Sequence, residues 1–316
     1  MSLEQIFSQI DLTGTHWIHP HRHGSGTLQV AGGTASVMIV EDSPGDVPVE
    51  VERAEEVILM TQLFDVSRMN QVTDESNDRL LNLESEVGDE FMLVNGQYKP
   101  TLEITAGEWQ RWRVVFASWD ENPLDFAMVS GGVCEMNLLA KDGIYINDYP
   151  RPLNFYPVST AGRADIMVRC SATGTFAVTT YLDDLFTLNV IAPNGAIDVS
   201  TPPTLGFQFP APTYLNDLQE RTPTPGCTCD TRLANNQVNG LSYDPDIFVH
   251  KVAVGSLVER NLEGINNHPY HRKCQKERTD EVGLSHNFYR LEIHHFRFIP
   301  STKIRTCISL PDTRSC

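Results

Sequence analysis

The stretch Gly14–Asp42 reads GTHWIHPHRHGSGTLQVAGGTASVMIVED and combines closely spaced histidines with two apolar runs. The apolar runs lie on either side of Gly32-Gly33, which predicts a strand, a tight turn and a second strand over Thr27–Asp42. In an extended strand, residues two apart point to the same face, so the His19 and His21 imidazoles are expected side by side. Imidazole is a preferred ligand of copper, zinc, iron and nickel. The stretch therefore predicts β structure that carries a metal site.

The other histidines are distributed unevenly. His16 and His23 belong to the same stretch and are candidate auxiliary ligands. A second cluster, His268-Pro269-Tyr270-His271, contains a proline that fixes φ, so its two imidazoles can point to different metal ions. For either cluster, a run of surface or loop histidines that binds metal only incidentally is the alternative. Four histidines without a recognisable partner are interpreted as structural or surface residues: His250, His286, His294 and His295.

Short segments with the character of strands continue through the chain. Strand pairs are expected around Ala106-Gly107, Asp183-Asp184 and Val254-Gly255, and a short helix around Leu80–Val87. Many short strands joined by turns rich in Gly, Pro, Asp and Asn are typical of β-sandwiches. The segments concerned are Glu56–Val66, Thr101–Ser118, Gly174–Pro193 and Ile247–Leu262.

Composition and charge disfavour several classes of function. The 316 residues are 41% hydrophobic and 21% charged, as in ordinary soluble globular proteins. The net charge of -17 argues against a nucleic acid or an anionic membrane as partner, because such partners require patches of Lys and Arg. No stretch is long and apolar enough to span a bilayer, and Met1–Leu12 lacks the features of a signal peptide. Seven cysteines are an odd number, and Cys227 and Cys229 are expected to be free or bridged to distant partners.

Four segments, in order, resemble the multicopper oxidases. Gly14–Asp42 is similar to that family's second copper-ligand segment, Gly-Thr-x-Trp-Tyr-His-x-His, and to the strands that close its first cupredoxin domain. Leu93–Ser118 and Leu138–Cys170 resemble parts of the middle domain. Val252–His271 resembles the third domain's approach to a His-Pro-x-His-x-His motif. The resemblance covers residues 13–271 and is to laccase-like proteins with plastocyanin-like cupredoxin domains.

The resemblance implies an all-β fold of tandem cupredoxin-like Greek-key β-sandwich domains, of which the first and third are incomplete. Two Pro-rich stretches, Ser43–Val49 and Pro202–Pro225, agree with boundaries between such domains. From Lys273 onward the sequence has no steady period and does not resemble the family. The expected division is a remnant of the first domain at 1–45, the middle domain at 46–205, the start of the third at 206–272 and an aberrant tail at 273–316.

The resemblance also implies a chemistry. In the family, phenolic, amine or metal-ion donors are oxidised one electron at a time by a type 1 copper, and a type 2/type 3 copper cluster reduces O2 to water. By position, His19 and His21 match type 3 ligands, His268 a type 1 ligand and His271 a type 2 ligand. Copper, a small-molecule reductant and O2 are therefore the expected cofactor and partners. The family resemblance implies an extracellular location.

The chain departs from the family at several copper ligands. Lys273 occupies the position of the third histidine of the last motif, and none of the cysteines is flanked by histidine, so the type 1 thiolate is missing. The family's first His-x-His segment is not found in the 15 residues before His16. We therefore expect a chain truncated at both ends that is inactive as an oxidase.

Three alternatives remain open. An evolved non-enzymatic relative would explain the same departures. A non-catalytic copper- or zinc-binding cupredoxin module would use the first histidine cluster without turnover. A cupin-type enzyme is disfavoured, because the cupin motif needs a Glu soon after the second histidine, and the first Glu after His21 is Glu41.

Overall fold

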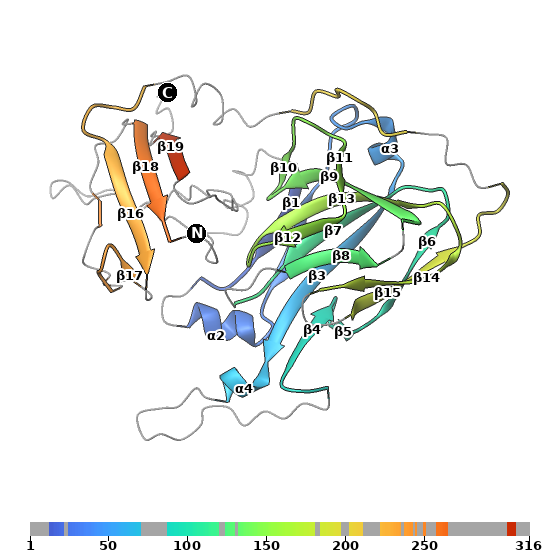
Figure 1. Cartoon of the computed structure of the whole chain (residues 1–316), viewed down its shortest axis with the longest axis horizontal. Helices are drawn as coiled ribbons and strands as arrows, with labels where there is room; N and C mark the ends of the chain where they lie inside the picture. Colours follow the sequence, from blue (N-terminus) through green and yellow to red (C-terminus); the bar gives the residue numbers. More distant parts are fainter. Residues whose placement is uncertain are drawn as a thin grey trace, which may run out of the picture. The chain divides into compact units, whose positions relative to one another are not determined.

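The first unit of the chain is built around strand β3 (Glu55–Asp65), which coincides with the apolar run predicted over Glu56–Val66. The structure is a computed structural model, and Figure 1 shows its elements. By contacts, the chain divides into two units, Met1–Ala211 and Pro212–Cys316. The residues that the structure describes are 13–21, 25–70, 87–119, 124–129, 132–180, 184–196, 202–210, 222–234, 237–242, 244, 249–250, 257–264 and 302–307.

Two sheets form most of the first unit. The larger sheet has the order β10-β9-β13-β7-β3-β4-β5, with β11 also paired to β9. Its remaining strands are β10 (Ile144–Tyr145), β9 (Cys134–Lys141), β13 (Arg163–Cys170), β7 (Gln110–Phe116), β4 (Glu90–Val94), β5 (Gln97–Tyr98) and β11 (Arg151–Leu153). The smaller sheet has the order β12-β8-β14-β15-β6. Its strands are β12 (Phe155–Val158), β8 (Leu124–Val129), β14 (Gly174–Thr179), β15 (Asp184–Ile191) and β6 (Thr101–Thr105).

One hydrophobic core lies between these two sheets. Trp112 and Phe116 of β7 are fully buried and belong to the same cluster as Phe186 of β15. The Trp112 and Phe186 rings meet edge to face, with centroids 5.5 Å apart. Such an arrangement defines a β-sandwich, in which inward-facing residues of both sheets interdigitate.

The segment Thr101–Ser118 contains two strands, as predicted, but they do not form a hairpin. Strand β6 pairs in parallel with β15, whereas β7 lies between β3 and β13 in the other sheet. The turn at Ala106-Gly107 therefore carries the chain across the core from one sheet to the other. Alternation of apolar residues marks a strand but does not specify its partner. The hairpin predicted within Gly174–Pro193 is confirmed, because β14 and β15 pair antiparallel.

The strand predicted before Gly32-Gly33 is wrong. Residues Gly26–Ala31 form a helix, α2, in which Gly32 N donates to Leu28 O at 3.0 Å. The helix buries Val30 and Ala31, and a short apolar run such as this one fits either a helix or a strand. The strand after the glycines, β2 (Ser36–Val40), instead pairs antiparallel with β1 (Gly14–Ile18) to form a two-stranded ribbon.

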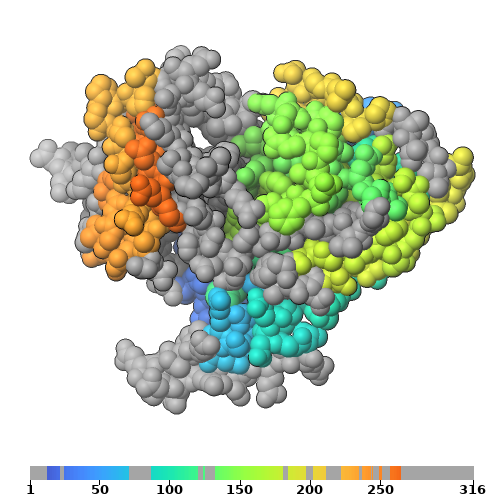
Figure 2. Space-filling model, viewed as in Figure 1, coloured from blue at the N-terminus to red at the C-terminus, as the bar shows by residue number. Residues whose placement is uncertain are grey.

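The first unit also contains two short helices and a segment, residues 202–210, that is hydrogen-bonded to one of them. Helix α3 (Val49–Glu52) follows the first Pro-rich stretch, and helix α4 (Val66–Met69) is capped by Asp65, whose carboxylate accepts from Arg68 N at 2.9 Å. Residues 202–210 lie on the surface of this unit, as the yellow segment of Figure 2 shows. There Thr204 donates its backbone N–H and its hydroxyl to the Glu50 carboxylate.

The second unit contains a four-stranded sheet of order β17-β16-β18-β19. Its strands are β16 (Thr228–Ala234), β17 (Gln237–Val238), β18 (Leu257–Glu263) and β19 (Thr302–Cys307). Strand β18 is the second half of the strand pair predicted over Ile247–Leu262, and most of the first half lies outside the described residues. Strand β19 lies in the tail that shows no steady period. The helix predicted around Leu80–Val87 also lies outside the described residues, apart from Val87.

The boundary between the two units falls within the predicted Pro-rich linker Pro202–Pro225. The division into a first-domain remnant, a middle domain and a third domain stays a prediction. No helix among the described residues is long and apolar enough to cross a membrane.

Candidate metal site

Strand β1 carries the first histidine cluster and lies against the large sheet at a point where only glycine fits. Gly14 has a φ of 136°, and a Cβ atom there would lie 2.7 Å from the carbonyl oxygen of Gly143. Contacts under 3.0 Å are essentially never made by real Cβ atoms. Gly14, the first residue of the histidine segment, is therefore a glycine because its backbone lies so close to that of Gly143.

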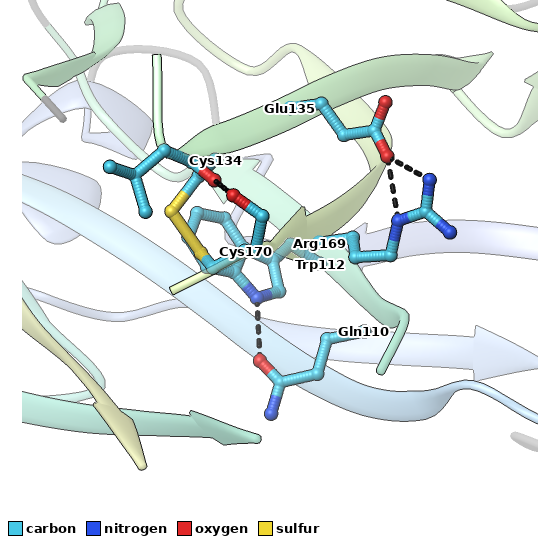
Figure 3. The surroundings of a disulfide bond; sticks show 8 residues. Gln110, Trp112, Cys134, Glu135, Arg169 and Cys170 are labelled. Carbon is cyan, nitrogen blue, oxygen red and sulfur yellow. Dashed lines mark hydrogen bonds and ion pairs between the residues drawn. A yellow bond between two sulfur atoms is a disulfide. The ribbon is translucent and has the colours of Figure 1, made fainter. Parts of the chain in front are cut away.

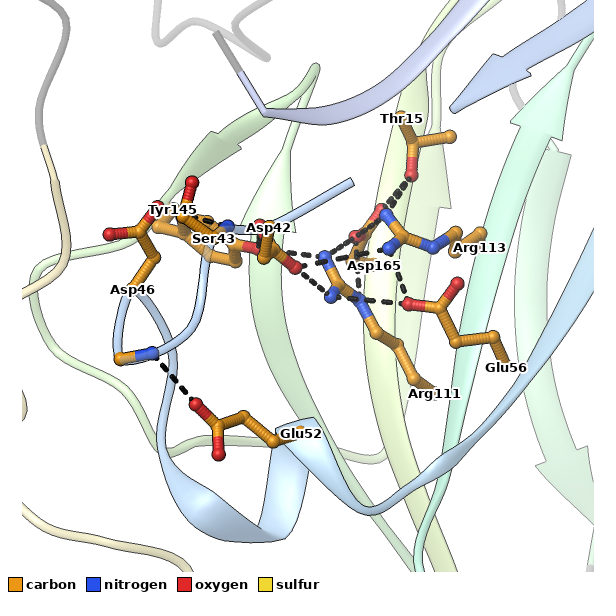
Figure 4. A network of polar contacts seen from close by, with 11 residues as sticks. Thr15, Asp42, Ser43, Asp46, Glu52, Glu56, Arg111, Arg113, Tyr145 and Asp165 are labelled. Atoms are coloured by element: carbon orange, nitrogen blue, oxygen red, sulfur yellow. Dashed lines mark hydrogen bonds and ion pairs between the residues drawn. The ribbon is translucent and has the colours of Figure 1, made fainter. Parts of the chain in front are cut away.

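Thr15 is fully buried and connects the ribbon to the sheet through side chain and backbone. Its hydroxyl donates to Asp165 Oδ1 at 2.6 Å and accepts from Arg113 Nη1 at 3.2 Å (Figure 4). Its carbonyl oxygen accepts from Arg163 Nε at 3.3 Å. Three polar contacts therefore join this residue to β7 and β13.

Thr15 lies at the edge of a buried ionic cluster, as Figure 4 shows. Arg111 donates to Asp165 Oδ2 through both Nε, at 3.0 Å, and Nη2, at 2.6 Å, and to Asp42 Oδ2 at 2.6 Å. Arg113 donates to Asp165 and to Glu56. The side chains of Arg111, Arg113 and Asp165 are each 1% exposed. Buried charges are tolerated only when they are paired in this way, so removal of one member is costly.

The cluster shifts the pKa of its members in opposite directions. Burial alone would raise the pKa of Asp42, but the hydrogen bond from Tyr145 and the Arg111 charge hold it below its usual value. Burial raises the pKa of Tyr145 well above its usual value, against the opposing effect of the Arg111 charge. Tyr145 donates its hydroxyl to Asp42, so the carboxylate is stabilised in its charged form and the phenol in its neutral form.

The His19 and His21 rings lie near each other just beyond the end of β1, with centroids 5.6 Å apart and planes tilted by 49°. The Trp17 ring stacks on His19 with a centroid distance of 4.1 Å. His19 Nδ1 lies 3.0 Å from the carbonyl oxygen of Pro20. Because a carbonyl oxygen only accepts, Nδ1 carries the proton and Nε2 keeps the lone pair with which a neutral imidazole binds a metal.

The donor chemistry of this pair suits copper, but the pair alone does not complete a site. Defined copper sites need about three or four protein ligands. Within the described part of the chain, no group of three or more His, Cys, Asp or Glu side chains is placed to hold a metal ion. His16 lies beside the turn at Gly143, where a Cβ atom would be 3.1 Å from its Cε1. His23, His268, His271 and Lys273 lie outside the described residues.

Four of the described cysteines and His250 are not among the predicted metal ligands. Cys134 and Cys170 face each other on β9 and β13 and form a disulfide near Trp112 (Figure 3). Cys227 and Cys229 are free thiols, one of the two outcomes expected for them. His250 Nε2 lies 3.3 Å from the Thr231 hydroxyl, and burial together with Arg260 lowers its pKa. This histidine has a structural environment, as predicted.

Comparison with known proteins identifies the architecture. The sequence matches no family model and no curated protein. The laccase from Pediococcus acidilactici is similar in structure, with a TM-score of 0.62 at 16% identity over 95% of this chain and 65% of that one. The chain has the multicopper oxidase fold. The McoA multicopper oxidase of Aquifex aeolicus gives a TM-score of 0.60 at 18% identity, over 96% of this chain and 70% of that one.

A third structure shows how much of a multicopper oxidase the chain spans. The laccase-like multicopper oxidase CueO of Ochrobactrum sp. gives a TM-score of 0.57 at 17% identity over 79% of this chain. The chain spans 59% of the length of that protein. The predicted all-β fold of cupredoxin-like sandwiches is confirmed by these multicopper oxidase structures.

Sequence reasoning located the histidine pair but missed the buried ionic cluster that contacts Thr15 of the same strand segment. The pattern Arg-Trp-Arg in β7 places Arg111 and Arg113 on one face of an otherwise apolar strand, and Asp165 similarly interrupts Ala-Asp-Ile-Met-Val in β13. Charges that alternate with core residues at the centre of a sheet signal a buried ion pair, because a central strand has no solvent-exposed face when both faces are covered.

Proposed function

We propose that the chain is a multicopper-oxidase-like protein that binds copper through His19 and His21 and does not reduce O2 by itself. The observation that carries the proposal is the imidazole pair at the end of β1, with rings 5.6 Å apart, on a scaffold of the multicopper oxidase fold. The family reaction couples one-electron oxidation of phenolic, amine or metal-ion donors to reduction of O2 to water. Copper, when bound, would supply the redox chemistry.

This chain's own residues have defined tasks in the proposal. His19 presents Nε2, because the Pro20 carbonyl holds the proton on Nδ1, and Trp17 limits the rotation of its ring by stacking. His21 contributes the second imidazole. His268 and His271 are assigned as ligands of a type 1 and a type 2 copper by their place in the sequence, and His16 and His23 as auxiliary ligands.

The proposed lack of turnover rests on two sequence positions. Lys273 places a cation where the family motif has a copper-binding histidine, and no cysteine in the chain has a histidine neighbour. Without a thiolate of that kind, a type 1 copper lacks its usual strong ligand. Electrons from a phenolic donor then have no defined entry to a copper cluster.

Oxygen uptake by copper-loaded protein with a phenolic donor tests this part of the proposal. We expect no uptake above that of the same amount of Cu(II) added to His19→Ala/His21→Ala protein. Sustained uptake, together with the intense visible absorption of a copper–thiolate bond, would contradict it.

A non-catalytic module that binds copper or zinc is the second candidate. It is favoured by the described donor set, in which only two imidazoles come together. Competition between Cu(II) and Zn(II) tests the zinc-binding form of this second candidate. A site that retains Zn(II) against equimolar Cu(II) would favour the zinc module, since copper normally exceeds zinc in affinity for nitrogen ligands.

A further inference from the structure

The two-stranded ribbon β1–β2 lies against the large sheet, and Thr15 joins the two through three polar contacts. A two-stranded ribbon is marginally stable on its own, so its orientation depends on what it packs against. Thr15 is 0% exposed. Its hydroxyl donates to Asp165 and accepts from Arg113, and its carbonyl oxygen accepts from Arg163. Gly14, directly before it, permits the ribbon to approach the turn at Gly143.

The connection continues from Thr15 to the histidine pair along one face of the strand. Residues two apart in a strand share a face, so Thr15 and Trp17 lie on the same side of β1, and His19 follows directly after its end. The Trp17 ring stacks on His19 with planes only 19° apart. His19 in turn lies beside His21. The buried hydroxyl therefore fixes the strand two residues before Trp17, whose ring contacts the first of the two imidazoles.

We propose that Thr15 is a positioning residue for the copper ligands, which orients His19 and His21 through its hydroxyl contacts with Asp165 and Arg113. The inference rests on the proposed function, because it assumes that the pair binds copper. The orientation of a ligating imidazole affects metal affinity, and here we infer that the anchored strand contributes to it.

The test compares threonine-to-valine changes at two buried positions of the first unit, Thr15 and Thr61. Thr15→Val removes the hydroxyl with little change of volume, and Thr15→Ser keeps it. Thr61→Val is the matched control, because Thr61 is also 0% exposed and its hydroxyl donates to a buried partner, Val115 O, at 3.1 Å. Cu(II) titration by calorimetry gives the affinity, and thermal unfolding gives the stability of each variant.

We expect Thr15→Val to weaken Cu(II) binding by about 10- to 100-fold, the range found for groups that orient metal ligands. Thr15→Ser should restore binding, and Thr61→Val should bind as the unchanged protein does even though it is also destabilised. In the metal-free protein, the imidazole ¹⁵N shifts of His19 should report one tautomer, and Thr15→Val should mix the two.

Three outcomes would decide against the inference or its basis. Equal Cu(II) affinity of Thr15→Val and the unchanged protein would overturn the positioning role, while the proposed function would stand. An equal loss of Cu(II) affinity in Thr61→Val would show that the effect of Thr15→Val comes from lower stability and not from positioning. Failure of the unchanged protein to bind Cu(II) would instead refute the proposed function. If Thr15→Val does not fold, Thr15→Ala also removes the hydroxyl contacts to Asp165 and Arg113 and is expected to weaken binding in the same direction.

Discussion

Replacement of Asp165 by Asn is expected to be the most destabilising single change in the ionic cluster. The Asp165 carboxylate is 1% exposed and accepts from Thr15, from Arg111 through two nitrogens and from Arg113. Asparagine keeps the shape but loses the charge, which leaves two buried guanidinium groups short of a counter-ion. Breaking a buried pair in this way costs about 3–5 kcal/mol.

The matched control is Glu135→Gln, which breaks a more exposed ion pair between β9 and β13 of the same sheet. Glu135 accepts from Arg169 Nε at 2.6 Å, but its side chain is 47% exposed (Figure 3). Exposed pairs of this kind contribute about 0–1 kcal/mol, so the free energy of unfolding should hardly change.

Urea denaturation followed by tryptophan fluorescence measures both changes in the relevant unit. All four tryptophans lie at positions 17, 109, 112 and 119, within the unit Met1–Ala211. The signal therefore reports unfolding of the unit that contains the cluster. A loss for Asp165→Asn below about 1 kcal/mol, no larger than an exposed pair provides, would refute the view that the cluster holds the ribbon on the sheet.

Three further predictions concern the same unit. The folded-state pKa of Asp42 lies below its usual value of 3.8, so its contribution to stability is present above pH 3.8 and is lost as the pH falls below it. In Asp42→Asn protein, the urea midpoint should therefore change less with pH across this acid range than in the unchanged protein. Gly14→Ala should lower the free energy of unfolding by about 1–3 kcal/mol, because it adds a strained φ and a clash with Gly143. Gly45→Ala is the control and should cost less, because Gly45 has a φ of 88° but open space around it. Equal losses in the two variants would contradict the close approach of Gly14 to Gly143. Reduction of the Cys134–Cys170 disulfide, which closes a loop of sequence separation 36, should cost about 2–4 kcal/mol in the same assay, and an unchanged midpoint would count against a structural role.

Local features of the fold could be predicted from the sequence because they depend on local patterns. The apolar run of β3 and the β14–β15 hairpin follow from alternation and from the turn residues between the strands. The proximity of His19 and His21 was predicted from their spacing of two, although both lie just beyond the end of β1. The multicopper oxidase fold was indicated by the order of four segments, since no single one of them is specific.

Other features depend on partners distant in the sequence and were missed. The strands β6 and β7 are adjacent in the chain but belong to different sheets, and alternation contains no information about that choice. Helix α2 has an apolar run too short to distinguish a helix from a strand. The cluster joins Thr15 to Arg113 and Asp165, which are about one hundred and one hundred and fifty positions away, so its assembly follows from tertiary structure alone.

Titration of the metal-free protein with Cu(II) tests the central claim most directly. We predict saturable binding by the unchanged protein and by His250→Ala, whose histidine contacts Thr231 in the second unit, and a loss of the tightest binding in His19→Ala/His21→Ala. Equal binding by the double variant and the unchanged protein would contradict the assignment of this histidine pair as a copper-binding element on a multicopper oxidase scaffold.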